Sequence, residues 1–264
     1  GSNYNNDGAT GTDALAAGVK AQAAQRNSIA IGNEAKVENS PANPSSSSIA
    51  IGDKAKAQGD LALAIGPGAT VSGESAAGGI AIGSAATSKN GGMAVGSGAN
   101  AGNGTPMIPG LPVRLNNNVA LGDSALVKDD TNFRVALGSF SIAGESDLAA
   151  APYKPTANAN VAGIAGSGVE LGEVSVGGDN TAGMGKILYR RVTNVAAGAA
   201  DTDAVNVSQL KAAQAAATSK VAAGNGISVT PTVDANTGST TYTVAADTTA
   251  LNVGDGNNGN PAGK

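Results

Sequence analysis

The sequence lacks cysteine and histidine and is poor in aromatic residues. Its 264 residues include no Trp, two Phe and four Tyr. Without cysteine there is no disulfide framework. Without histidine, Ser-His-Asp and Cys-His catalysis, histidine general bases and typical zinc sites are excluded. These absences remove the commonest catalytic and metal-binding chemistry, and they predict a core unlike that of an ordinary globular domain.

Long apolar runs and an excess of positive charge are missing too. No run of 18 apolar residues exists, so no transmembrane helix is expected, and no signal peptide is recognisable. The net charge of −4 argues against a nucleic-acid-binding surface. Gly1-Ser2 is typical of a cloning scar, and we expect the chain to be an excised fragment of a longer protein.

The sequence is rich in a short repeat, seen clearly as Ser28-Ile29-Ala30-Ile31-Gly32. Each copy places two larger apolar residues around a central alanine, followed by glycine and, after two free residues, a small residue. The paired apolar residues are Ile29 and Ile31, Ile49 and Ile51, Leu63 and Ile65, Ile80 and Ile82, Met93 and Val95, Val119 and Leu121, and Val135 and Leu137. Such self-similarity predicts a stacked architecture.

The period of two within each copy predicts a strand that has its larger side chains on one face and alanine on the other. Strands this short bury too little alone, so we expect them to stack in register, with the larger residues as a continuous core. The alanine face is then expected to pack against copies of the same chain. Each glycine allows the chain to turn, through a positive φ or a close backbone approach, and the small residue after it should pack at the corner or start the return strand.

After the repeats the pattern changes, which divides the chain into six segments. Asp201, Thr202 and Asp203 are capping candidates for a helix that should begin near Asp203. Coiled-coil seam spacing follows at Val207, Leu210, Gln214, Ala217 and Val221. Two runs, 226–230 and 240–244, then predict a hairpin. The expected segments are a lead-in (1–13), the repeat domain (14–177), a connecting segment (178–210), a short coiled coil (211–222), a small β module (223–247) and the start of another module (248–264).

These motifs resemble a known family. The Ser-Ile-Ala-Ile-Gly-x-x-Ala repeats are similar to the head of trimeric autotransporter adhesins of the YadA-like type, and 190–210 is similar to that family's neck. The resemblance implies a left-handed parallel β-roll, with three copies around one axis above a coiled-coil stalk. It implies that the neck clamps the three chains through Arg190, Val192, Asn194, Val195, Gly198, Asp203, Ala204, Val205, Asn206, Val207, Gln209 and Leu210.

The resemblance also implies a location and partners. It places the chain at the outer membrane of a Gram-negative bacterium, exposed at the cell surface, and the family's anchor is not in this fragment. The implied partners are two further copies of the chain and a host extracellular-matrix protein, a cell surface or an abiotic surface. In some family heads, Asn-Ser-Val-Ala-Ile-Gly motifs are tied to collagen binding. Only the segment from Asn27 to Gly32 matches that form here, with Ile29 in place of Val, and we interpret it as structural first.

Contact with a ligand is predicted for two projecting loops, 102–117 and 144–172. They carry the chain's rare large side chains, Met107, Ile108, Arg114, Tyr153 and Lys154. The alternative is that these loops cover roll edges or a groove of the trimer. No metal or cofactor is expected, apart from an axial anion or water that Gln214 could hold in the coiled-coil seam.

Two other functions remain open at this point. The fragment could be a passive spacer that lifts another head off the membrane. It could also be an enzyme, because the repeats resemble the hexapeptide repeats of left-handed β-helix acyltransferases, which are trimers too. The lack of histidine, the irregular spacing of the repeats and the neck argue against the enzyme. The leading hypothesis is the head of a surface adhesion fibre, which would gain from multivalency.

Overall fold

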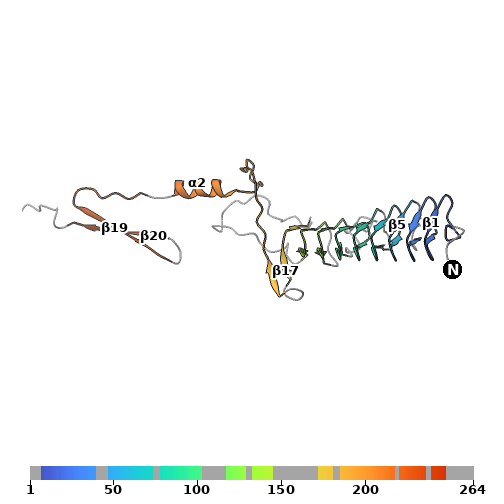
Figure 1. Cartoon of the computed structure of the whole chain (residues 1–264). Coiled ribbons are helices and arrows are strands. Elements are labelled where there is room, and N and C mark those ends of the chain that lie inside the picture. The colour runs from blue at the N-terminus through green and yellow to red at the C-terminus, as the bar shows by residue number, and fades with distance from the viewer. Residues whose placement is uncertain are drawn as a thin grey trace, which may run out of the picture. The chain divides into compact units, whose positions relative to one another are not determined.

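The computed structural model describes residues 7–39, 47–73, 78–102, 117–128, 133–144, 172–180, 185–217, 220–235 and 239–247 (Figure 1). The chain divides into two units, Gly1–Thr193 and Asn194–Lys264. The described residues of the first unit form mainly a parallel β-solenoid, and those of the second unit form one helix and one hairpin. No helix among the described residues is long and apolar enough to cross a membrane.

The repeat strands form one parallel sheet of the solenoid, each strand in register with the next copy. Ala30 pairs with Ala50, for example, and Ile31 pairs with Ile51. The strands of this first sheet follow the order β1 (Leu15–Ala17), β3 (Ile29–Ile31), β5 (Ile49–Ile51), β7 (Leu63–Ile65), β9 (Ile80–Ile82), β11 (Met93–Val95), β12 (Val119–Leu121), β14 (Val135–Leu137) and β16 (Val174–Ser175). The expected stacking of the repeats is thereby confirmed.

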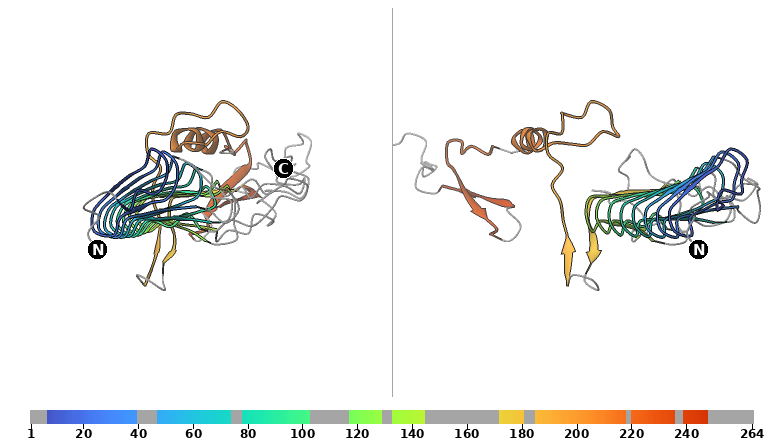
Figure 2. Two further views of the ribbon diagram at one scale, coloured as in Figure 1. Left: turned by 90° about the vertical axis from the view of Figure 1, so that its right-hand side faces the viewer. Right: turned by 45° about the vertical axis from the view of Figure 1, so that its right-hand side comes forward.

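A second parallel sheet closes each coil, and it is made of the return strands. Its strands are β2 (Gln22–Ala23), β4 (Lys36–Glu38), β6 (Lys56–Gln58), β8 (Thr70–Ser72) and β10 (Thr87–Lys89), and further along β13 (Leu126–Val127) pairs with β15 (Ile142–Ala143). Asn100 forms bridges to Thr87 and to Leu126, which joins the two parts. Each coil therefore contributes one short strand to each sheet, and successive coils stack side by side (Figure 2).

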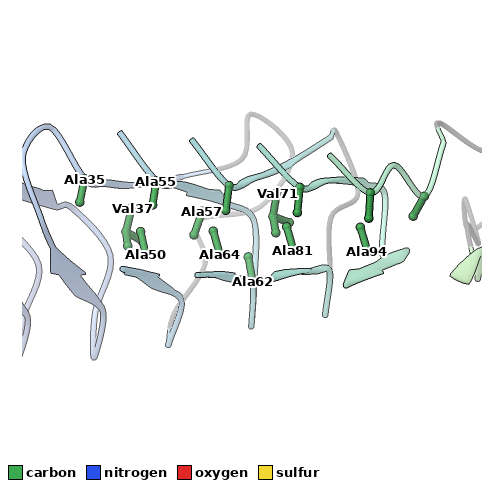
Figure 3. Packing of buried hydrophobic residues seen from close by; sticks show 14 of the residues in the cluster. Ala35, Val37, Ala50, Ala55, Ala57, Ala62, Ala64, Val71, Ala81 and Ala94 are labelled. Carbon is green, nitrogen blue, oxygen red and sulfur yellow. The ribbon is translucent and has the colours of Figure 1, made fainter. Parts of the chain in front are cut away.

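The core between the two sheets is made mainly of alanine, and this corrects the predicted orientation. Ala30, Ala50, Ala64 and their counterparts in other copies are fully buried, whereas the isoleucines beside them are only half-buried or exposed. Figure 3 shows the alanines pointing inward from both sheets, with Val71 directed toward Ala81. The largest fully buried side chains are Gln25, three valines, Asn118 and serines. A roll this narrow has room for small side chains only, since protein interiors are close-packed.

The correction applies to every residue that was predicted to form the head core. None of these side chains lies among the buried core residues: Ile29, Ile31, Ile49, Ile51, Leu63, Ile65, Ile80, Ile82, Met93, Val95, Val119, Leu121, Val135 and Leu137. The alanines that were predicted to face other copies of the chain lie inside their own roll instead. The strand period was predicted correctly, but the two faces were exchanged.

The glycine after each repeat strand turns the chain at one corner of the roll. Gly32 has a φ of +130°, and a Cβ added to it would lie 2.4 Å from the carbonyl oxygen of Gly52 in the next coil. Positive φ and close backbone approach therefore both apply. Ala35 follows as a buried corner residue directly before β4, as predicted.

The opposite corner is where the chain departs from the regular repeat. There, each coil passes from a second-sheet strand to the next first-sheet strand, and the number of residues between the two strands varies: four separate β6 from β7, and ten separate β4 from β5. The stacked glycine corner holds two residues between Gly and the small residue in every copy. The coils therefore differ in length between a second-sheet strand and the next first-sheet strand, and not at the glycine corner.

After β16 the first unit ends in an antiparallel pair, β17 (Gly178–Asn180) and β18 (Lys186–Leu188). In the second unit, α2 (Val207–Ala217) precedes β19 (Ile227–Val233) and β20 (Thr240–Ala246), which form the expected hairpin. The helix begins at Val207 and not near Asp203, because Asn206 is the residue that caps it. Val221, the last predicted seam residue, lies beyond the helix.

Candidate functional site

The first sheet presents a continuous apolar face on the outside of the roll. Alternation places every second side chain outward, and in all nine strands the outward residues are apolar. Neighbouring strands half-bury most of them, while Leu137 stays 45% exposed and Val174 67% exposed. None of the nine strands contains a charged residue, and we call this surface the apolar face of the roll. A contiguous exposed apolar surface marks an interaction site.

The second sheet presents a mostly polar surface on the other side. Its outward residues include Lys36, Glu38, Lys56, Gln58 and Thr70. The Lys56 ammonium lies 2.9 Å from the Glu38 carboxylate of the adjacent strand, whereas Lys56 itself is directly opposite Lys36 in the register. An exposed ion pair of this kind adds little stability, and the surface is suited to water or to a polar ligand. The two sides of the roll therefore differ sharply in chemistry.

Arg190, predicted as a clamp residue, lies against the end of its own roll. Its guanidinium donates to Ser141 Oγ at 2.9 Å and to the carbonyl oxygens of Ser139 and Val176. These acceptors come from the turn after β14 and from the segment after β16. Arg190 therefore holds the last coil together. Val192, two residues further on, is exposed.

The remaining predicted clamp residues belong to the second unit, where a polar cluster closes the start of α2. Asn206 Oδ1 accepts a hydrogen bond from the backbone N–H of Gln209 at 3.1 Å, and Gln209 Oε1 accepts one from the backbone N–H of Asn206 at 3.2 Å. This reciprocal pair is a capping box. Gln209 also pairs with the backbone of Gly198, at 3.0 and 2.9 Å, and Asn206 Nδ2 donates to the Val195 carbonyl at 3.2 Å. The loop before the helix is thereby folded back onto its first turn.

Asp203 and Gly198 fix the shape of that loop. The Asp203 carboxylate accepts from the amides of Ala200, at 3.0 Å, and Ala199, at 2.8 Å, and these bonds lower its pKa below the ordinary value of 3.8. A Cβ on Gly198 would come within 2.9 Å of the Ala204 carbonyl oxygen, so the site requires glycine. Asn194, with a φ of +60°, turns the chain at the start of the second unit.

The apolar residues around this cluster are left uncovered within the described part of the chain. Val205 is 69% exposed and Leu210 62% exposed, and Val207 is similar. Gln214 lies on α2 with an exposed side chain. No group of three or more metal-binding side chains occurs among the described residues. The hydrogen bonds of the polar cluster thus join residues of one chain, while its apolar side chains remain available to partners.

A buried ion pair near the end of the roll was missed at the sequence level. The Arg134 guanidinium lies 3.0 Å from the Glu173 carboxylate, with side chains 9% and 15% exposed. Glu173 also accepts from the Gly144 amide, and Asn118 Oδ1 accepts from the Arg134 amide at 3.0 Å. The pair joins the residue directly before β14 to the residue directly before β16, the strand that stacks on β14. The sequence signal was Arg134 at a position where earlier copies carry Ser28 or Ser48.

The two loops that were predicted to contact a ligand, 102–117 and 144–172, lie almost entirely outside the described residues. Met107, Ile108, Arg114, Tyr153 and Lys154 lie outside the described residues. Among the described residues that bracket these loops, Gly102 and Gly144 follow second-sheet segments, and Gly172 precedes the first-sheet strand β16. Ligand contact by the loops stays a prediction.

Comparison with known proteins gives consistent matches for the roll and for the segment after it. Residues 9–35 and 46–69 match the family model described as the YadA head domain repeat, and 191–233 match that of the coiled stalk of trimeric autotransporter adhesin. The solved collagen-binding domain of the Yersinia adhesin YadA is 28% identical, with a TM-score of 0.53. The match covers 78% of this chain and 85% of that chain. No curated protein matches.

Proposed function

Because the chain belongs to the YadA-like trimeric autotransporter adhesins and forms the head region of such an adhesin, we propose that three copies assemble through the apolar faces of their rolls. The observation that carries this proposal is the chemistry of the outward side chains. They are uninterruptedly apolar on the first sheet and largely polar on the second. Burying the first face among three copies leaves the second in water.

Each segment of the chain has a proposed place in this assembly. We assign residues 14–177 to the head, 178–210 to the neck, 211–222 to a short coiled coil and 223–247 to a small β module, with 1–13 and 248–264 at the ends. In the neck, exposed Val192, Val205, Val207 and Leu210 would meet their counterparts, while Asn206 and the other polar residues hold each chain in shape. Two observations support the clamp: the polar side chains of the neck form their hydrogen bonds within one chain, and its apolar side chains stay uncovered in that chain.

For the partner, we propose an extracellular-matrix protein bound by the water-facing part of the trimer at the surface of a Gram-negative bacterium. The support is the similarity to the collagen-binding domain of YadA. Three identical sites on one head would raise the avidity of a weak contact. Family and fold point to an adhesin rather than to an enzyme, and the spacer function is not favoured.

The assembly is tested by placing a charge on each face in turn. Ile51 points outward from the middle of the apolar face, and Gln58 points outward from the polar face. Neither lies among the buried core residues. I51K would bring three like charges together at the interface, so in a dilution series followed by light scattering we expect its trimer to dissociate to folded chains of 25.1 kDa at a concentration at least about tenfold higher than the natural trimer, although the neck is intact. Q58K, the matched control, should remain trimeric.

Two results would count against the proposals separately. An I51K trimer that dissociates at the same concentration as the natural trimer would exclude the apolar face as the interface. The matrix proposal is tested by binding of the natural trimer to immobilised collagen. I51K is expected to bind at least about tenfold more weakly, because avidity is lost. A natural trimer that does not bind collagen or another matrix protein would overturn the matrix proposal and leave the assembly intact.

A further inference from the structure

An exposed Asn-Gly pair lies in the link between α2 and the hairpin. Asn225 and Gly226 are the two central residues of a turn, which the backbone N–H of Ile227 closes by donating to the Gly224 carbonyl at 3.1 Å. Gly226 has a φ of +74°, as a type II turn requires of its third residue. The Gly226 carbonyl accepts from the backbone N–H of Asp247 at 2.8 Å, beside the end of β20. This turn therefore sets where the hairpin begins.

The surroundings of Asn225 leave its side-chain amide able to meet the next backbone nitrogen. Asn225 is exposed, and a Cβ added to the neighbouring Gly224 would have no atom within 4 Å. Among the described residues, neither the Asn225 side chain nor the Gly226 backbone N–H takes part in a hydrogen bond. Gly226 also has no side chain to hinder an approach to its nitrogen. The electrophile and the nucleophile of a cyclisation are therefore adjacent, unbonded and in contact with water.

We propose that Asn225 is a site of spontaneous deamidation, at which the link between helix and hairpin is chemically altered as the protein ages. The Gly226 nitrogen gives up its proton to water and bonds to Asn225 Cγ, which closes a succinimide ring. The bond from Cγ to the side-chain nitrogen breaks, and that nitrogen leaves as ammonia. Water then opens the ring at either carbonyl, so residue 225 becomes aspartate or isoaspartate. Water is the only co-reactant, and no group is oxidised or reduced.

A second Asn-Gly pair, in the roll, has the same residues in the opposite environment. Asn90 is 7% exposed, and its backbone N–H donates to the Ser72 carbonyl of the adjacent coil at 3.0 Å. A Cβ added to Gly73 would lie 2.1 Å from Asn90 Oδ1, so this side chain is confined between two coils. Cyclisation with Gly91 would first require the coils to open locally, which occurs rarely in a packed core. The structure therefore separates two sites that the sequence motif alone cannot distinguish.

The reaction has a structural consequence for the turn. Both products place a negative charge at residue 225, and isoaspartate also carries the backbone through its β-carbon, which lengthens the turn by one atom. The hydrogen bond from Ile227 to Gly224 depends on the present spacing, so it is lost in the isoaspartate form. The start of β19 is then no longer fixed to the link. This change occurs within one chain and depends neither on the proposed trimer nor on the proposed matrix partner.

The test is to age the full chain in warm, mildly alkaline buffer and to follow its peptides by tandem mass spectrometry. The mass gained when an amide becomes a carboxylate is assigned to a residue from the fragment ions, and enzymatic methylation detects isoaspartate. We expect Asn225 to react at least about tenfold faster than Asn90, because only Asn90 must wait for local opening. The variant N225Q keeps a side-chain amide on a chain one methylene longer, which cyclises far more slowly, and it should stay unchanged at this residue.

Each outcome bears on a separate part of the proposal. Equal rates at Asn225 and Asn90, or an Asn225 that persists while Asn90 reacts, would overturn it. Aspartate without isoaspartate at residue 225 would exclude the succinimide, since direct hydrolysis of the amide gives aspartate alone. Hydrogen exchange tests the effect on the turn: the Ile227 amide should exchange faster in the aged natural chain than in equally aged N225Q. Equal exchange in the two aged samples would overturn the predicted loss of the turn.

Discussion

The orientation of the repeat strands, with alanine inside the roll and the larger side chains outside, can be tested at two adjacent residues of β9. Ala81 points inward and is fully buried, with Val71 directed toward it (Figure 3). Ile82 points outward and is half-buried between Ile65 and Val95 of the adjacent strands. The substitutions A81I and I82A each change one of these positions. The sequence-based orientation and the observed orientation predict opposite outcomes for them.

The space around Val71 sets the magnitude for A81I. A methyl group added to Gly79 would already lie 2.6 Å from Val71 Cγ1, while carbon atoms in contact prefer about 3.5–4.0 Å. Three further carbons at Ala81 would gain about 2 kcal/mol if they could be buried freely. With this interior filled they force the sheets apart, and overpacking costs about 3 kcal/mol or more. That is a large part of a total stability of about 5–15 kcal/mol.

The assay is urea unfolding of the full chain followed by circular dichroism, with light scattering on the same samples. We expect A81I to shift the unfolding midpoint strongly or to abolish the β signal. I82A should keep the β signal, lose about 1 kcal/mol through its smaller outward contact, and dissociate from the trimer more readily. An A81I chain as stable as the natural one, or an I82A chain with an unfolded roll, would refute the observed orientation.

Three further predictions concern the neck and the end of the roll. N206A removes the helix cap and should cost about 1 kcal/mol, measured as faster amide exchange across α2; unchanged exchange would contradict the capping role. R134A leaves the buried carboxylate of Glu173 unpaired and should cost about 3 kcal/mol in thermal unfolding, whereas a loss below about 1 kcal/mol would place the pair in solvent. The folded-state pKa of Asp203 is lowered by the amides of Ala200 and Ala199, so its contribution is complete above pH 3.8 and is lost as the pH falls below that value. D203N should remove this part of the acid sensitivity, and an unchanged acid-unfolding curve would exclude the carboxylate as its source.

Much of the fold followed from the spacing of residues alone. The repeat strands, the glycine corners and the hairpin at 227–246 depend on local backbone rules, which a sequence displays directly. The start of α2 was placed too early because Asp201, Thr202, Asp203 and Asn206 all have capping chemistry. Only the reciprocal bonds with Gln209 decide among them, and those depend on how the loop folds back.

The orientation of the roll was missed because larger apolar side chains were assumed to be the buried ones. Within the seven clear copies, the central residue is always alanine, whereas the flanking positions vary among Ile, Leu, Val and Met. The tightest position is the one that tolerates least variation, so the alanine column was the signal for the interior. The Arg134–Glu173 pair was hidden for another reason: its partners are far apart in sequence, and stacking alone brings them together.

The narrow interior has a consequence for how the head is stabilised. Among the described residues, no Ile, Leu, Phe or Met side chain is fully buried, and the core consists of alanine with a few valines. Each buried methyl contributes about 0.8 kcal/mol, whereas ordering each residue costs about 1–2 kcal/mol of backbone entropy. The larger apolar side chains, whose burial would offset this loss of backbone entropy, lie outside on the apolar face of the roll. In the assembly proposed above, these larger side chains would be buried against other chains, so folding and assembly of the head would be coupled.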